Sequence, residues 1–153
     1  MSYLQPIPPM LAHPQASASF GPMRPRIARA DAPLVLVADD HESSREVARL
    51  VLESAGYRVV EAATGIEALA IARVDRPRVV LLDVVMPGLD GWSVARRLRA
   101  DPLTARITLI TLTALASAAD RDASLASGCD DVLTKPIHPR MLLSVLGRYA
   151  TLM

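Results

Sequence analysis

The chain has 153 residues, 51% of them hydrophobic, with 17 basic and 16 acidic side chains and a formal net charge of +1. This length suits one domain with a sizeable core, and the charge balance gives no electrostatic case for nucleic acid or a membrane as an obligatory partner. The single cysteine, Cys129, excludes an internal disulfide framework and a cysteine-based metal cluster.

Residues 1–32 are set apart by their composition. They hold half of the 12 prolines of the chain and show neither a helical nor a strand period, so we expect a disordered arm. Prolines interrupt its apolar stretches, and no run in the chain approaches the roughly 20 apolar residues that cross a bilayer. We therefore expect no secretory signal, no membrane span and a cytoplasmic location. One domain is expected over 33–150, followed by a tail at 151–153.

Short apolar runs after residue 32 are typical of strands that are buried on both faces. They predict five strands, at Leu34–Ala38, Arg58–Ala62, Arg78–Leu82, Ile107–Leu112 and Asp131–Leu133.

A helical pattern follows each of these strands. The capping boxes Ser43–Glu46 and Thr64–Glu67 predict the starts of the first two helices. The fourth helix, 117–127, is rich in alanine and has Leu125 as its only large apolar side chain, so we expect it to be weakly anchored. The expected buried stripes of the others are Val47, Leu50 and Val51; Ile66, Leu69, Ala70 and Val74; Val94, Ala95 and Leu98; and Met141, Leu142, Val145, Leu146 and Tyr149.

The alternation of strand and helix predicts an α/β fold, a doubly wound parallel sheet of five strands covered by helices on both faces. Right-handed crossovers leave few topologies for such a chain. In sheets of this kind the ligand site lies beyond the carboxyl ends of the strands, so the residues there are the candidates for function.

Polar side chains collect at those strand ends. The first strand is followed by Asp39 and Asp40, the third by Asp83, the fourth by Thr113, and the fifth by Lys135 two residues on. Each residue alone has an ordinary interpretation, such as a helix cap, a turn or a solvated lysine. Clustered carboxylates repel one another unless a cation lies among them, and an oxygen-only set with no histidine or cysteine nearby favours Mg²⁺. A metal, a free carboxylate and a lysine together make a site for phosphoryl transfer.

The pattern resembles the receiver domain of two-component response regulators over about residues 33–150. The resemblance rests on Asp39-Asp40, on the run Leu81–Gly91 with its DxxMPxxDG pattern, on Thr113-Ala114 and on Gly128–Pro136, at intervals similar to those of the family. It implies a flavodoxin-like fold with strand order 2-1-3-4-5, which the family shares with the chemotaxis regulators.

The resemblance also assigns roles to the site residues. It implies that Asp83 is the phosphoacceptor, that Lys135 pairs with Asp83 and then with the phosphoryl group, and that Thr113 hydrogen-bonds a phosphoryl oxygen. Mg²⁺ is expected on Asp40, Asp83 and the main-chain carbonyl of Val85, with Asp39 acting through water or through its field. The Lys135-Pro136 bond is expected to be cis.

The implied protein is a signalling switch rather than an enzyme, a stand-alone response regulator that takes its phosphoryl group from a histidine kinase or a histidine phosphotransfer protein. The chain ends soon after the last helix, so we expect no DNA-binding domain and an output through binding an unidentified target protein. A homodimer linked to phosphorylation is left open. The alternatives are a phosphorelay intermediate that passes the group to a histidine phosphotransfer protein, a receiver that acts as a scaffold without phosphorylation, and an aspartyl phosphohydrolase.

Two departures from the family pattern carry their own hypotheses. Val132 stands where receivers usually have Tyr or Phe, so we expect the output to pass through a shift of the segment after the fourth strand. Val85 and Leu115 flank the site and neither can position a water, so we expect a phosphoryl group that leaves slowly without a phosphatase.

Overall fold

A computed structural model describes residues 28–114 and 117–150. In that part of the chain five parallel strands form one sheet in the order β2-β1-β3-β4-β5, as predicted. The elements in chain order are β1 (Leu34–Ala38), α2 (Glu42–Ser54), β2 (Arg58–Ala62), α3 (Gly65–Asp75), β3 (Val79–Asp83), α4 (Gly91–Ala100), β4 (Thr108–Thr113), α5 (Ala118–Ala126), β5 (Asp131–Thr134) and α6 (Pro139–Tyr149).

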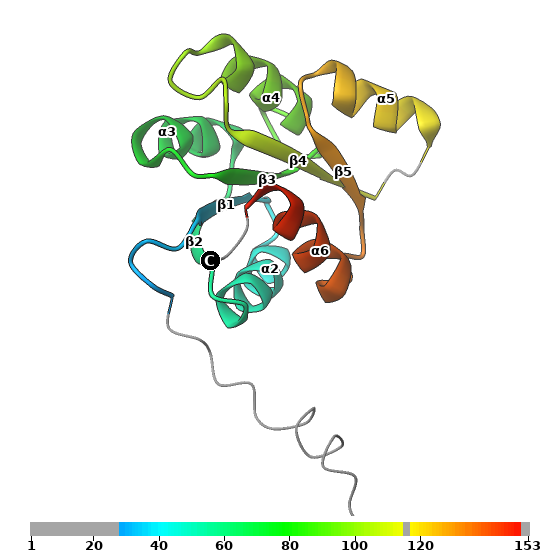
Figure 1. Cartoon of the computed structure of the whole chain (residues 1–153). Coiled ribbons are helices and arrows are strands. Elements are labelled where there is room, and N and C mark those ends of the chain that lie inside the picture. Colours follow the sequence, from blue (N-terminus) through cyan, green and yellow to red (C-terminus); the bar gives the residue numbers. More distant parts are fainter. Residues whose placement is uncertain (1–27, 115–116, 151–153) are drawn as a thin grey trace, which may run out of the picture.

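The helices cover the sheet on both faces. Helices α2 and α6 lie on one face, and α3, α4 and α5 lie on the other (Figure 1). Each face has its own core: Leu81 belongs to the core under α2 and α6, and its neighbour Leu82 belongs to the core under α3 and α4. Strand β3 is buried along its whole length because it lies between two strands and two helical layers, which explains its unbroken apolar run.

Helix α2 differs from its prediction. It begins at Glu42 after His41, so the expected capping box at Ser43 and Glu46 is wrong. Val47 and Leu50 are each 56% exposed, whereas Val51 packs against the core as predicted. The fully buried residues of the helix are Ala48 and Leu52. The Asp39 carboxylate accepts a hydrogen bond from the amide of His41 at 2.9 Å, which makes a tight turn into the helix.

Helix α3 confirms its capping box but not its buried stripe. Thr64 Oγ1 accepts a hydrogen bond from the amide of Glu67 at 3.1 Å. Ile66 and Val74 are exposed, however, and the small residues Ala68 and Ala72 face the sheet. Small side chains at the contact let a helix approach a sheet closely. The pattern of apolar residues in the sequence does not show whether the alanines or the larger side chains beside them make this contact.

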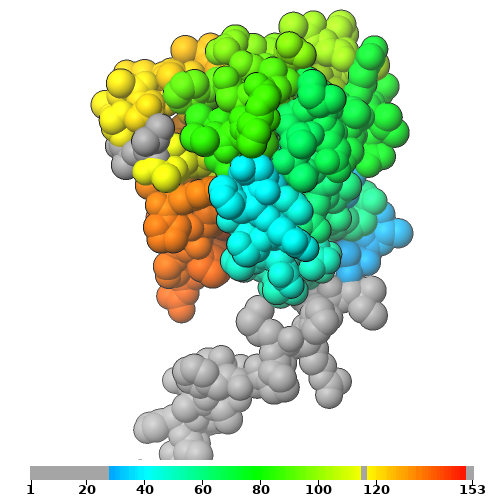
Figure 2. Space-filling model, turned by 180° about the vertical axis from the view of Figure 1, so that it is seen from behind, coloured from blue at the N-terminus to red at the C-terminus, as the bar shows by residue number. Residues whose placement is uncertain are grey.

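The last two helices agree more closely with expectation. In α6 the residues Leu142, Val145 and Leu146 are buried, whereas Met141 is 55% exposed. Figure 2 shows α6 (orange) beside α2 (cyan), with the segment around β3 and α4 (green) above them. In α5 the only buried residue is Ser124, and Leu125 is 44% exposed, which agrees with a weakly anchored helix.

The described chain begins inside the predicted arm. Residues 30–32 form a turn in which Ala32 is buried, and the Ala32 carbonyl accepts a hydrogen bond from Arg58 Nε at 2.8 Å. The rest of the predicted arm and the predicted tail lie outside the described residues. None of the helices among the described residues is long and apolar enough to cross a membrane.

Candidate functional site

The predicted site residues meet at the carboxyl edge of the sheet. Asp39 follows β1, Asp83 ends β3, and Lys135 follows β5. Lys135 Nζ donates hydrogen bonds to Asp39 Oδ2 at 2.8 Å and to Asp83 Oδ2 at 3.2 Å. Both carboxylates are almost fully buried, with side chains only 2% and 7% exposed. The pairing of Lys135 with Asp83 was expected, and its shorter contact with Asp39 was not.

Lys135 is the only lysine of the chain, since the other 16 basic residues are arginines. A compact ammonium on a flexible stem can reach between two carboxylates, whereas a planar guanidinium is wider and pairs best with one carboxylate at a time. The presence of one lysine among 17 basic residues is therefore a feature of the sequence that points to this site.

Charge and burial act against each other on these three groups. Burial raises the pKa of the Asp83 carboxyl; the Lys135 ammonium opposes this rise and the negative Asp39 reinforces it. Burial also acts to raise the pKa of Asp39, but hydrogen bonds from Lys135 and the His41 amide outweigh it, so the net shift is downward. Burial acts to lower the pKa of Lys135, and the two carboxylates raise it overall. Asp39 is therefore the carboxylate that keeps its charge most firmly.

Thr113 and Val85 lie at the same edge of the sheet as the two acids and the lysine. Thr113 is the buried last residue of β4, and its carbonyl accepts a hydrogen bond from the amide of Lys135 at 2.7 Å. The amide of Val85 donates to Asp83 Oδ1 at 3.2 Å, and the Val85 side chain is exposed. Leu115 lies outside the described residues. The Lys135-Pro136 bond is cis, as expected.

The turn after β3 requires its glycine at Gly91. The amide of Gly91 donates to the Val84 carbonyl at 2.9 Å, and a Cβ at this position would lie 2.2 Å from the carbonyl oxygen of Asp83. Asp90 starts α4 by accepting a hydrogen bond from the amide of Ser93 at 2.8 Å. The Asp-Gly pair of the motif thus ends the loop and keeps it against the backbone of the phosphoacceptor candidate.

Four side chains could hold a cation at this edge. Ligand atoms of Asp39, Asp40, His41 and Asp83 all lie within 4.8 Å of one another. Asp40 Oδ1 is buried and accepts no hydrogen bond, so a cation would satisfy it. Three carboxylates fit Mg²⁺, which is bound through oxygen. The expectation of a site without histidine is wrong, because the turn after β1 brings His41 beside both acids.

A parallel sheet in this strand order, with acids after β1 and β3 and a lysine after β5, defines the class of receiver domains. Residues 35–147 match the family model of the response regulator receiver domain, and the chain belongs to this family. Members of the family accept phosphoryl groups and act as signalling switches rather than as classical enzymes. They bind Mg²⁺ at an acidic pocket and interact with histidine kinases or phosphotransfer proteins.

The relatives include long and short proteins. The response regulator PleD of Caulobacter vibrioides is 44% identical over 110 residues, which are 72% of this chain but 24% of PleD, so the chain spans about a quarter of that relative. The chemotaxis response regulator CheY4 of Vibrio cholerae has 34% identity and a TM-score of 0.74, covering 77% of this chain and 98% of CheY4. The receiver domain of the sensor histidine kinase PA1611 of Pseudomonas aeruginosa, solved with a magnesium ion in its active site cleft, has 36% identity and a TM-score of 0.72, covering 77% and 97% of the two chains.

Proposed function

We propose that this protein is a stand-alone response regulator that accepts a phosphoryl group on Asp83 in the presence of Mg²⁺. The observation that carries the proposal is the triad in which the only lysine bridges the buried carboxylates of Asp39 and Asp83 at the carboxyl edge of the sheet. A buried carboxylate with an adjacent ammonium is arranged to attack phosphorus and to have the resulting charge neutralised.

The chemistry follows from these groups. An Asp83 oxygen forms a bond to phosphorus while the P–N bond of a phosphohistidine, or the P–O bond of an acyl phosphate, breaks and the leaving group takes the electron pair. Lys135 then exchanges its contact with Asp83 for a phosphoryl oxygen, and the Thr113 hydroxyl donates to a second one. Asp40, Asp83 and the Val85 carbonyl would hold Mg²⁺, with Asp39 acting through water, and the ion would supply positive charge to the phosphoryl oxygens.

The partners we propose are a histidine kinase or a histidine phosphotransfer protein as donor and a second protein as target. The same site would serve a phosphorelay intermediate equally well, so a transfer assay with a histidine phosphotransfer protein separates the two.

Intact-mass spectrometry tests the proposal directly. The protein is incubated with a small acyl phosphate, with and without Mg²⁺, and compared with Asp83→Asn and with Asp75→Asn, a change at an exposed acid at the end of α3. We expect a Mg²⁺-dependent gain of one phosphoryl group in the wild type and in Asp75→Asn, and none in Asp83→Asn. An adduct that persists in Asp83→Asn would refute the assignment of Asp83. If neither the small acyl phosphate nor a histidine kinase gave an adduct, the protein would be a binding module that does not depend on phosphorylation.

A further inference from the structure

His41 has no evident task in the fold. It precedes α2 as the cap residue, but its side chain makes no capping hydrogen bond, and its imidazole is 68% exposed. Its structural roles belong to its backbone: the amide donates to the Asp39 carboxylate, and the carbonyl accepts a hydrogen bond from the amide of Arg45. The imidazole is nevertheless held at the acidic edge of the sheet, with Nδ1 at 3.0 Å from Asp40 Oδ1 and at 3.4 Å from Asp39 Oδ1.

The contact with Asp40 is close and yet is not a hydrogen bond. Asp40 Oδ1 has no hydrogen-bond partner among the described residues although the imidazole nitrogen lies 3.0 Å away. The nitrogen and the oxygen therefore lie side by side and do not point at each other as donor and acceptor. Two adjacent ligands of an octahedral ion with bonds of about 2.1 Å lie about 3.0 Å apart, so this separation is that of neighbouring ligands of one cation.

We propose that His41 is a nitrogen ligand of the cation site and that it shifts the preference of this receiver from Mg²⁺ toward divalent transition metals. The inference rests on the proposed function, because it uses the cation site that Asp40 and Asp83 are proposed to form. A site of oxygens alone suits hard ions, and one imidazole added to it favours Co²⁺, Ni²⁺ or Zn²⁺, which bind nitrogen far better than Mg²⁺ does.

The exposure of the imidazole makes this role accessible. A side chain that is 68% exposed can turn through a small rotation without disturbing the core, so it can complete a coordination shell begun by the buried acids. For the same reason its removal leaves the fold intact, which allows the metal preference to be measured in a stable variant. His138, the other described histidine, caps α6 through Nδ1 and serves as a matched control.

The test measures Co²⁺ and Mg²⁺ binding to the full chain by calorimetry at mildly alkaline pH, because metal ligands bind in their deprotonated form. The variants are His41→Ala and the control His138→Asn, which keeps a capping side chain. Removing a residue that only supports a metal ligand lowers metal affinity by about 10- to 100-fold. We therefore expect the loss of a direct ligand to lower Co²⁺ affinity by at least about tenfold. Mg²⁺ affinity changes by less than about threefold, because Mg²⁺ replaces the nitrogen with water.

A second readout shows whether the nitrogen itself binds. Paramagnetic Co²⁺ shifts the ring protons of a bound imidazole far outside the normal proton NMR range, and we expect such resonances in the wild type and in His138→Asn but not in His41→Ala. Equal weakening of Co²⁺ and Mg²⁺ in His41→Ala, or no shifted ring protons, would overturn the inference while leaving the Mg²⁺-dependent switch standing. Failure of the wild type to bind either ion would overturn this inference together with the cation site of the proposed function.

Discussion

Tyr57 is the residue that ties the end of α6 to the rest of the domain. Its side chain lies in the core under α2 and α6, and its hydroxyl donates a hydrogen bond of 2.9 Å to the carbonyl of Ala150, 93 residues away along the chain. A buried phenol that has one partner resists ionisation, and burial accordingly raises the pKa of Tyr57.

We predict a loss of stability at alkaline pH that depends on Tyr57. Because the folded-state pKa is raised, the contribution of Tyr57 is fully present below the unfolded value near 10 and is lost as pH rises through the folded value. Tyr57→Phe should cost about 1 kcal/mol at neutral pH, through the lost hydrogen bond, and should reduce the alkaline decline. Urea unfolding at neutral and alkaline pH measures both effects. An unchanged alkaline decline in the variant would assign it to other groups.

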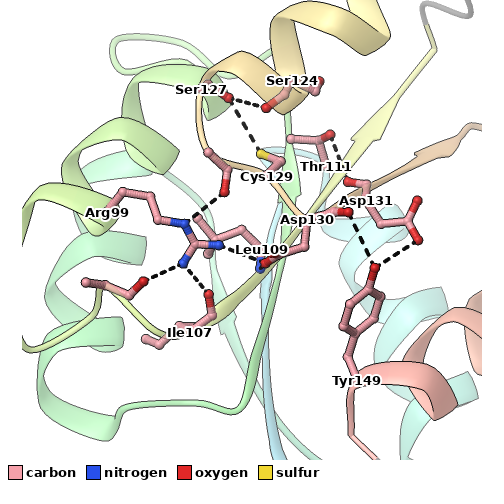
Figure 3. Close-up of polar contacts among 12 residues, drawn as sticks. Arg99, Ile107, Leu109, Thr111, Ser124, Ser127, Cys129, Asp130, Asp131 and Tyr149 are labelled. Atoms are coloured by element: carbon pink, nitrogen blue, oxygen red, sulfur yellow. Dashed lines mark hydrogen bonds and ion pairs between the residues drawn. The ribbon is translucent and has the colours of Figure 1, made fainter.

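Arg99 is a side chain on α4 that links this helix to the segments that precede β4 and β5. From α4 it donates to the carbonyls of Gly128, Ala105 and Ile107 and forms an ion pair with Asp130 at 2.7 Å (Figure 3). Asp130 in turn accepts a hydrogen bond from the amide of Leu109 at 2.9 Å. The end of α4 and the beginnings of β4 and β5 are thereby joined by one guanidinium group.

We predict that Arg99→Met destabilises the domain by about 2–3 kcal/mol. Its carbonyl partners would lose their donors and Asp130 its countercharge, and the value is kept below that of a fully buried pair because the side chain is 25% exposed. Arg97→Met, a change of an exposed arginine on the same helix, should cost less than about 0.5 kcal/mol. Thermal or urea unfolding measures the free energy of unfolding of both variants. Equal losses of stability would show that helix propensity, and not the carbonyl contacts, causes the effect.

Helix α5 is held by polar contacts rather than by apolar burial. Its one buried residue, Ser124, accepts a hydrogen bond from Trp92 Nε1 on α4 at 2.9 Å, and the Ser124 carbonyl accepts one from Ser127 Oγ at 2.6 Å. Figure 3 shows Ser124 and Ser127 above Cys129, at the point where the chain passes from α5 toward β5. Val132 on β5 is half-buried and is aliphatic, so this position has no aromatic ring to rotate.

We predict that phosphorylation slows amide hydrogen exchange in Ala118–Ala126. A hydrogen bond from Thr113 to a phosphoryl oxygen would draw in the segment that leads to α5, and a helix with few buried contacts adjusts at little cost. Hydrogen exchange monitored by mass spectrometry, with and without a small acyl phosphate, provides the measurement, and Asp83→Asn is the control. No difference in α5 between the two states would exclude this helix as the responding element.

The part of the chain that the structure describes has two apolar cores that share one sheet. Leu81 and Leu82 are neighbours in β3, both have no exposed surface, and they point to opposite faces of the sheet. A sheet whose strands serve both cores cannot lose one layer and keep the other intact, so we expect the domain to unfold as a unit.

We predict that Leu81→Ala and Leu82→Ala each destabilise the domain by about 2–5 kcal/mol and leave a single transition. Trp92, the only tryptophan, lies on the α4 side, whereas far-ultraviolet circular dichroism reports on all helices. In urea the two signals should coincide for the wild type and for both variants. A fluorescence transition that moves alone in Leu82→Ala would reveal two independently unfolding layers.

The order of the elements and the residues at the strand ends followed from the sequence because both depend on local patterns. A strand buried on both faces needs a continuous apolar run, and parallel strands bring their carboxyl ends to one edge wherever the helices lie. Asp39, Asp83, Thr113 and Lys135 could therefore be placed together before any packing was known.

Tertiary structure alone decided which helix faces are buried and what else joins the site. Ala48 and Ala68 face the sheet in place of larger neighbours because the contact depends on how closely a helix approaches, which an apolar stripe does not record. His41 reaches the acids because the turn after β1 is closed by the carboxylate of Asp39, and Arg99 meets the carbonyl of Gly128, 29 residues along the chain. These contacts depend on distances between segments that only the assembled sheet brings together.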